Sequence, residues 1–303
     1  MKVFVTGGTG AIGRYAVPAL VAAGHEVHAL ARTDEKVAQL QAQGAVPVPG
    51  VSLFEASQLK DAFTGVDAVA NLATAIPPVT KALRAGAWAE NERIRREGSA
   101  AVVDAALAAG VDRLVQESIT FTYPDSGDEW IDESVPVEVP EAFGAVIAAE
   151  SNAVRFTAQG GIGVVLRFGL FYGNGSSHTD QFVAAARRHV APVAGAPDSS
   201  QSSIHLADAG QAVVAALGIP AGTYNVCDDE PLTKEEYAAA LGAALGKRPW
   251  VNAPGRLGRF AGKQSDFMSR SQRVSNAKFK AASSWSPRYP SAREGWKEII
   301  DDA

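Results

Sequence analysis

A glycine-rich segment near the start of the chain limits the possible folds more than any other feature. The segment Thr6-Gly7-Gly8-Thr9-Gly10-Ala11-Ile12-Gly13 follows an apolar strand pattern over 3–5 and precedes a helical pattern over 13–23. A glycine motif in this context is typical of a dinucleotide-binding βαβ unit. Gly7 permits a tight turn, Gly10 lets the backbone approach a pyrophosphate, and Gly13 lets the helix pack closely on the strand. The first helical amides, near Ala11 and Ile12, then face the anion.

Strand-length apolar runs alternate with alanine-rich helical stretches beyond this motif. The alternation predicts an α/β fold of the Rossmann type, a doubly wound parallel sheet with helices on both faces. The expected strands are 3–5, 26–30, 46–48, 67–72, 113–117 and 163–167, and the expected helices are 13–23, 35–43, 56–63, 88–109 and 145–158.

The pattern changes after Gly173, where polar and glycine-rich loops bracket short helices. We therefore expect a dinucleotide-binding domain over 1–173, to which segments near 203–228 return, including strands at 203–205 and 223–226. A smaller C-terminal substrate lobe is expected over 174–202 and 229–303.

Charge and composition exclude several classes of partner. The chain has 28 basic and 33 acidic side chains, a net charge of −5, and no basic patch for nucleic acid. The single Cys227 cannot form an internal disulfide, and no apolar run reaches the ~18 residues of a membrane span. The first residues do not resemble a secretion signal. We expect a cytoplasmic protein, a monomer or homodimer, that acts on a small molecule.

The end of the second expected strand indicates which dinucleotide binds. A carboxylate about 20 residues after the glycine motif would hold the ribose 2′-hydroxyl of NAD. This chain instead has Ala31 and Arg32 there. A guanidinium matches the geometry and charge of a 2′-phosphate. The sequence therefore favours NADP, although NAD stays possible.

The landmarks of the chain resemble those of a known superfamily. Besides the glycine loop, they are Asn71-Leu72-Ala73, Gly98-Ser99, residues 115–118, residues 167–173, residues 204–208 and Tyr224-Asn225-Val226. Together they resemble the short-chain dehydrogenase/reductase superfamily, in its extended and atypical branches of NAD(P)-dependent epimerase/dehydratase type. The resemblance implies further cofactor contacts at Val51, Leu53, Leu72, Ala73, Thr74, Phe168 and Leu170. Val51 departs from the usual aspartate that faces the adenine.

The proton-donating pair of this superfamily is missing. Members usually have a Tyr and a Lys four residues apart on a helix, preceded by a Ser or Thr at a strand end. Counting back from Glu150 places Ala142 and Val146 in these two positions, and the chain has no Tyr between Tyr123 and Tyr172 and no Lys between Lys81 and Lys234. The resemblance places Ser118 in the serine position.

A replacement proton donor is expected near the same sheet edge. Tyr123 is the leading candidate, and His205 or water is the alternative. Arg95 or Arg96 could reach an anionic group or form a surface salt bridge. Neither histidines nor the cysteine gather with acids at metal-ligand spacing, so no metal site is expected.

Three functions stay open from the sequence. The first is an NADP(H)-dependent oxidoreductase acting on a carbonyl, hydroxyl or activated double bond of a small organic molecule. In this reading Ser118 orients the substrate oxygen. The second is a cofactor-retaining epimerase, dehydratase or isomerase, and the third is a regulator that senses NADP(H) without turnover.

Overall fold

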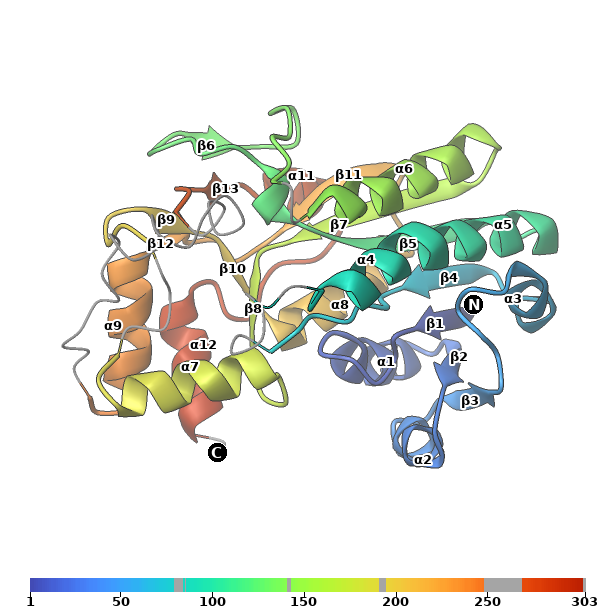
Figure 1. Ribbon diagram of the computed structural model, residues 1–303, viewed down its shortest axis with the longest axis horizontal. Helices are drawn as coiled ribbons and strands as arrows, with labels where there is room; N and C mark the ends of the chain where they lie inside the picture. Colours follow the sequence, from blue (N-terminus) through green and yellow to red (C-terminus); the bar gives the residue numbers. More distant parts are fainter. Residues whose placement is uncertain (79–83, 85, 141–142, 191–194, 248–268, 302–303) are drawn as a thin grey trace.

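The computed structural model describes residues 1–78, 84, 86–140, 143–190, 195–247 and 269–301. Its centre is a sheet of seven strands in the order β11-β7-β5-β4-β1-β2-β3, and every neighbouring pair is parallel (Figure 1). The strands are β1 (Lys2–Thr6), β2 (Glu26–Ala31), β3 (Val46–Pro49), β4 (Ala68–Asn71), β5 (Arg113–Ile119), β7 (Ile162–Phe168) and β11 (Gly222–Val226). The strand order reverses between β1 and β4, which confirms the doubly wound Rossmann-type sheet.

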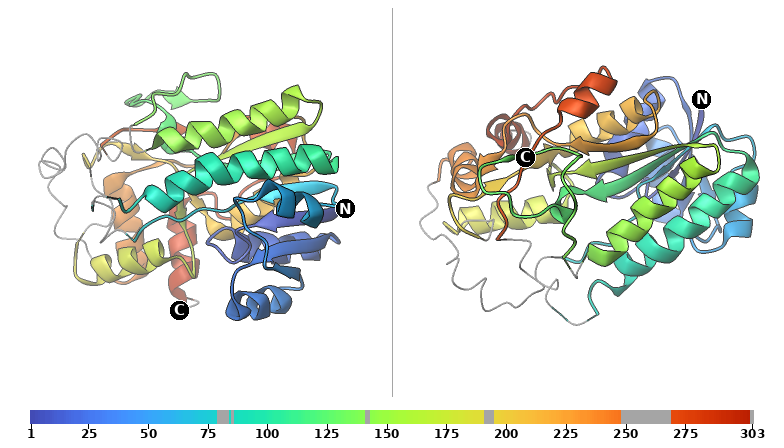
Figure 2. Two further views of the ribbon diagram at one scale, coloured as in Figure 1. Left: turned by 45° about the vertical axis from the view of Figure 1, so that its right-hand side comes forward. Right: turned by 90° about the horizontal axis from the view of Figure 1, so that it is seen from above.

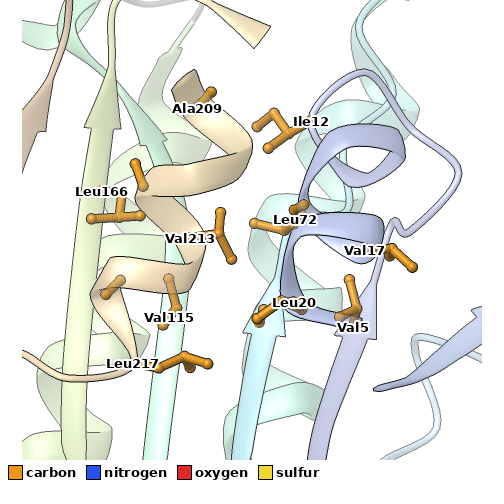
Figure 3. Close-up of a cluster of buried hydrophobic side chains, with 14 of the residues drawn as sticks. Val5, Ile12, Val17, Leu20, Leu72, Val115, Leu166, Ala209, Val213 and Leu217 are labelled. Atoms are coloured by element: carbon orange, nitrogen blue, oxygen red, sulfur yellow. The ribbon is translucent and has the colours of Figure 1, made fainter. Parts of the chain in front are cut away.

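Helices cover both faces of the sheet, as its apolar strands require. One face carries α3 (Ala56–Ala62), α5 (Ser99–Ala109) and α6 (Gly144–Ala158), and α5 and α6 lie side by side in Figure 2. The other face carries α1 (Gly13–Ala22) and α8 (Leu206–Ala216), which pack on each other. Leu20, Leu72 and Val213 meet in this second core (Figure 3). Helix α2 (Asp34–Ala42) joins β2 to β3.

A second group of elements gathers at one end of the molecule, on the left of Figure 1. It contains α7 (Ser177–Arg187), α9 (Lys234–Ala244) and α12 (Ala292–Asp301), with short strand pairs β8 (Leu170–Tyr172) with β10 (Ser203–His205) and β9 (Ser200–Gln201) with β12 (Leu232–Thr233). A separate aromatic core, built around Tyr172, Tyr237 and Trp296, holds its helices together. Strands β6 (Trp130–Ile131) and β13 (Arg273–Val274) form one further pair.

The structure differs from the sequence expectations at three places. The expected helix over 88–109 is divided into α4 (Ala89–Arg93), a π-helical turn Ile94–Gly98, and α5. Of the two strands expected to return to the first domain, β11 joins the main sheet, whereas β10 pairs with β8. Phe279 of α11 (Ala277–Ala282) and Trp285 pack in the core of the main sheet, although their segment was assigned to the lobe. These pairings join segments far apart in sequence, so local patterns do not reveal them.

Candidate functional site

The glycine loop forms a tight turn between β1 and α1. Gly7 has a φ of +71°, and a Cβ there would stand 2.7 Å from the backbone of Leu72. The amide of Gly10 donates to Gly7 O at 2.9 Å. A Cβ on Gly13 would stand 2.2 Å from Gly7 O, so α1 begins directly against the turn. Gly10 and Ala11 at the crest are exposed, while Ile12 is buried. This bare backbone at a helix N-terminus fits a pyrophosphate.

The other predicted cofactor residues follow the carboxyl ends of the strands. Leu72, which is buried against the turn at Gly7, and the half-buried Ala73 and Thr74 come after β4. Val51 and Leu53, also half-buried, come after β3. Ligands of open α/β sheets bind along this edge, where the strand order reverses.

Two predicted contacts lie in less open surroundings. The side chain of Phe168 is wholly buried in the main core, 5.2 Å from the Phe171 ring between centroids. Leu170 is half-buried and packs against the aromatic core of the lobe. A cofactor contact at Phe168 is therefore limited to the backbone.

Two cationic side chains lie within electrostatic range of each other after β2. Arg32 is exposed, and Thr33 caps α2 by accepting the amide of Lys36 at 3.4 Å. Partial burial, and then the positive charge of Arg32, lower the pKa of Lys36, whereas Glu35 acts in the opposite direction. The sequence analysis did not single out Lys36, although its place in the first turn of α2, just after Arg32, was the available signal.

Ser118 and Tyr123 belong to one buried polar network across three strands and α6. The Ser118 hydroxyl donates to Glu150 Oε1 at 2.5 Å, and Arg167 holds the same carboxylate through Nε at 2.8 Å and Nη2 at 2.7 Å. Arg167 Nη1 donates to the Tyr123 hydroxyl at 2.9 Å, which itself donates to Asn225 Oδ1 at 2.9 Å. These buried hydrogen bonds link β5, β7 and β11 to α6, although Asn225 Nδ2 has no partner among the described residues.

The placement of Tyr123 favours a structural role over proton donation. Its side chain is fully buried, and burial raises the pKa of its phenol, against the lowering effect of Arg167. Ser118 is also fully buried, and its proton points to Glu150. Of the two positions that the resemblance assigns to the usual acid and base, Val146 is buried on α6, and Ala142 lies outside the described residues. The catalytic roles of Ser118 and Tyr123 stay predictions.

His205, the other sequence candidate for acid chemistry, caps α8. Its Nδ1 accepts the amide of Ala207 at 3.2 Å, and its ring packs between Tyr172 and Tyr289. Although Nε2 lies 3.3 Å from Glu298 Oε2, burial lowers the pKa of the imidazole to about 4. The ring is therefore neutral near pH 7, and the proton sits on Nε2 because Nδ1 accepts.

The two arginines of the long helical segment differ in their surroundings. Arg95 is buried and pairs with the buried Glu117, whereas Arg96 is exposed next to Gly144 at the start of α6. The expected surface salt bridge at Arg95 is therefore a buried one. Within the described residues, no group of His, Cys, Asp and Glu side chains is arranged to hold a metal, and no helix could span a membrane.

Residues 3–227, which include the glycine loop and, except for Lys2, the seven strands of the main sheet, match the NAD dependent epimerase/dehydratase family. The chain belongs to that family. A Streptomyces protein named 3-diazoavenalumate denitrifying reductase is 33% identical over 97% of this chain and 99% of its own length. A ketoreductase from Stigmatella aurantiaca, named for a farnesyl dihydroquinoline oxide, is 33% identical over 52% of this chain and 46% of its own.

Solved structures agree with this assignment at the level of the fold. A human epimerase family protein with NADPH superposes with a TM-score of 0.78 over the full length of both chains, at 22% identity. The family and the reductase names together support a nicotinamide-dependent oxidoreductase or epimerase.

Proposed function

We propose that the protein is an NADP(H)-dependent oxidoreductase that acts on a small organic molecule. The observation that carries the proposal is the pair of Arg32 and Lys36 beside the glycine loop at the end of β2. Two neighbouring cations repel each other, and a 2′-phosphate would relieve this repulsion while accepting charge-assisted hydrogen bonds. The reductase that matches nearly the whole chain supports the same reading.

Calorimetry with NADP and NAD tests the cofactor preference. Loss of a charge-assisted contact of ~1.5–3 kcal/mol weakens binding by a factor of about 10–150. We therefore expect Arg32→Ala and Lys36→Ala each to weaken NADP binding at least 10-fold, with NAD binding changed less than about threefold. Lys60→Ala, on the exposed side of α3, is the matched control for a lost positive charge. Equal affinity of the wild type for both cofactors would refute the preference.

The nature of the acceptor follows from the few available proton donors among the described residues around α6. The side chain of Val146 has no ionisable proton. The Tyr123 hydroxyl is buried and donates to Asn225, and the Ser118 hydroxyl donates to Glu150. A bound nicotinamide supplies a hydride. Reduction of a carbonyl creates an alkoxide that needs a proton, whereas an acceptor that is already positive does not. We therefore favour electron-poor acceptors, with solvent as the proton source where one is needed.

A diazonium group is one acceptor that needs no proton. Its reduction balances as R–N₂⁺ + NADPH → R–H + N₂ + NADP⁺, in which the hydride replaces dinitrogen. The Streptomyces relative is named for reducing a diazo compound with loss of nitrogen. A diazo compound is therefore the second candidate substrate, besides a carbonyl or an activated double bond.

NADPH oxidation and dinitrogen release, followed side by side, separate these possibilities. The probes are 4-hydroxybenzenediazonium and 4-hydroxybenzaldehyde, and Gly10→Val protein controls for direct reaction with NADPH. Release of one dinitrogen per NADPH oxidised, above that control, supports the diazo reductase. Tight NADPH binding without oxidation by diazo, carbonyl or enone probes would favour the cofactor-retaining or sensing alternatives.

A further inference from the structure

Arg95 is a buried cation with unused hydrogen-bond donors. Its side chain is 2% exposed, and its Nη2 lies 2.9 Å from Oε1 and 2.8 Å from Oε2 of Glu117, which is 3% exposed. Its Nε and Nη1 are also buried, and neither has an acceptor among the residues that the structure describes. Buried guanidinium donors are ordinarily satisfied. An acceptor from outside the chain would be stabilised here.

The position of Arg95 is at the ligand-binding edge of the sheet. Glu117 follows Gln116, which pairs with Asn71 at the end of β4. The next residue, Leu72, lies against the turn at Gly7. The loop after β4 is also tied to α4, since the amide of Ala75 donates to Asn91 Oδ1 at 3.1 Å. Arg95 therefore lies at the carboxyl ends of β4 and β5, at the edge of the sheet that also carries the glycine loop.

The local charge at this position is positive. Glu117 balances one guanidinium, but Arg96 follows on the same turn and forms no ion pair with any described residue. Arg96 Nη2 reaches the N-terminus of α6, 3.3 Å from where a Cβ on Gly144 would stand, and the first turn of α6 has no acidic residue. The buried hydroxyl of Thr120, just beyond β5, also lacks a partner in the described structure.

We infer that Arg95, assisted by Arg96, binds a carboxylate of the substrate, so that the substrate class is small organic acids with a reducible group. A carboxylate offers planar acceptors to a planar guanidinium and neutralises the surplus positive charge. Glu117 holds the guanidinium in place. The inference rests on the proposed oxidoreductase function, because it assigns the substrate of the same site.

Binding of matched acids and esters to the full-length protein tests this inference. The probes are benzoate, cinnamate and pentanoate, each beside its methyl ester, titrated calorimetrically in saturating NADP⁺. Arg95→Lys keeps a positive charge for Glu117 but removes Nε and Nη1. The double variant Arg95→Leu/Glu117→Leu removes both charges, which avoids leaving an unpaired buried carboxylate. Arg155→Met, whose side chain pairs with Asp104 at the surface, controls for the loss of an arginine away from this edge of the sheet.

We expect the wild type and Arg155→Met to bind at least one acid 10-fold or more tightly than its ester. Both Arg95 variants should bind that acid and ester within threefold of each other. A wild type without preference for any acid, or a preference that persists in the double variant, overturns the inference. If the Arg95–Glu117 ion pair is only structural, the ratio of the affinities for the acid and the ester should be the same in the wild type and in the variants. NADPH oxidation with 4-formylbenzoate and its methyl ester is measured separately, so a protein that binds acids without turnover refutes the proposed function alone.

Discussion

Gly10 and Gly13 of the glycine loop are only three residues apart, but an added side chain should impair cofactor binding at one position and folding at the other. A Cβ on Gly10 would meet only Gly7 O, at 3.1 Å, and Gly10 does not have a left-handed backbone. A valine there occupies the space of the pyrophosphate and little else. A Cβ on Gly13 would stand 2.2 Å from Gly7 O and 2.6 Å from Gly8 backbone atoms, none of which can rotate away. Gly10→Val should therefore impair binding, and Gly13→Ala should impair folding.

The expected sizes follow from ligand linkage and from overpacking. NADP at 100 times its Kd stabilises the wild type by ~2.7 kcal/mol, which corresponds to a rise in Tm of roughly 5 °C. Gly10→Val should show no rise, with a ligand-free Tm within about 2 °C of the wild type. Overpacking destabilises by ~1–3 kcal/mol, so Gly13→Ala should lower the ligand-free Tm by about 2–6 °C.

Thermal unfolding followed by circular dichroism, with and without NADP, measures both quantities. Gly218→Ala is the control for loss of a glycine alone, because Gly218 does not have a left-handed backbone and its Cβ position meets only Ala215 O, at 3.8 Å. A Gly10→Val protein with the full NADP-induced rise in Tm would refute the assignment of the loop to the cofactor. A Gly13→Ala protein as stable as the wild type would refute the packing argument.

Two further predictions concern buried side chains that sequence reasoning had considered for acid chemistry. Tyr123→Phe should change turnover by less than about threefold. It should destabilise the fold by ~1–3 kcal/mol, because Arg167 Nη1 and Asn225 Oδ1 lose their partner. A fall in kcat of ~10²–10⁴ at unchanged stability would instead establish Tyr123 as the proton donor. For His205, the pKa falls from 6.5 to about 4 on folding, so its contribution to stability is complete above pH 6.5 and is lost as the pH falls towards 4. His205→Asn keeps a capping side chain. In denaturant titrations, the free energy of unfolding of the wild type should fall by roughly 3 kcal/mol more than that of this variant between pH 7 and 4. An equal fall in both proteins would contradict a buried neutral imidazole.

The proposed cofactor half of the site can be predicted from the sequence because its determinants are local. The strand over 3–5, the turn at Gly7 and the helix from Gly13 are consecutive, so their order alone indicates a phosphate-binding unit. Arg32 comes directly after the next strand, so its place at the expected ribose position can also be predicted from the local sequence. Lys36 could be predicted in the same way, since it lies in the first turn of the helix that follows Arg32.

Only the tertiary structure decides which polar side chains face a ligand and which hold the fold together. Tyr123 was a plausible acid in sequence, but residues 44 and 102 positions away enclose its hydroxyl. The pairing of Arg95 with Glu117 joins a helix to a strand end 22 residues later, and it turns an expected surface ion pair into a buried one. Burial and hydrogen-bond partners depend on how distant segments pack, and periodicity records only that a residue faces inward.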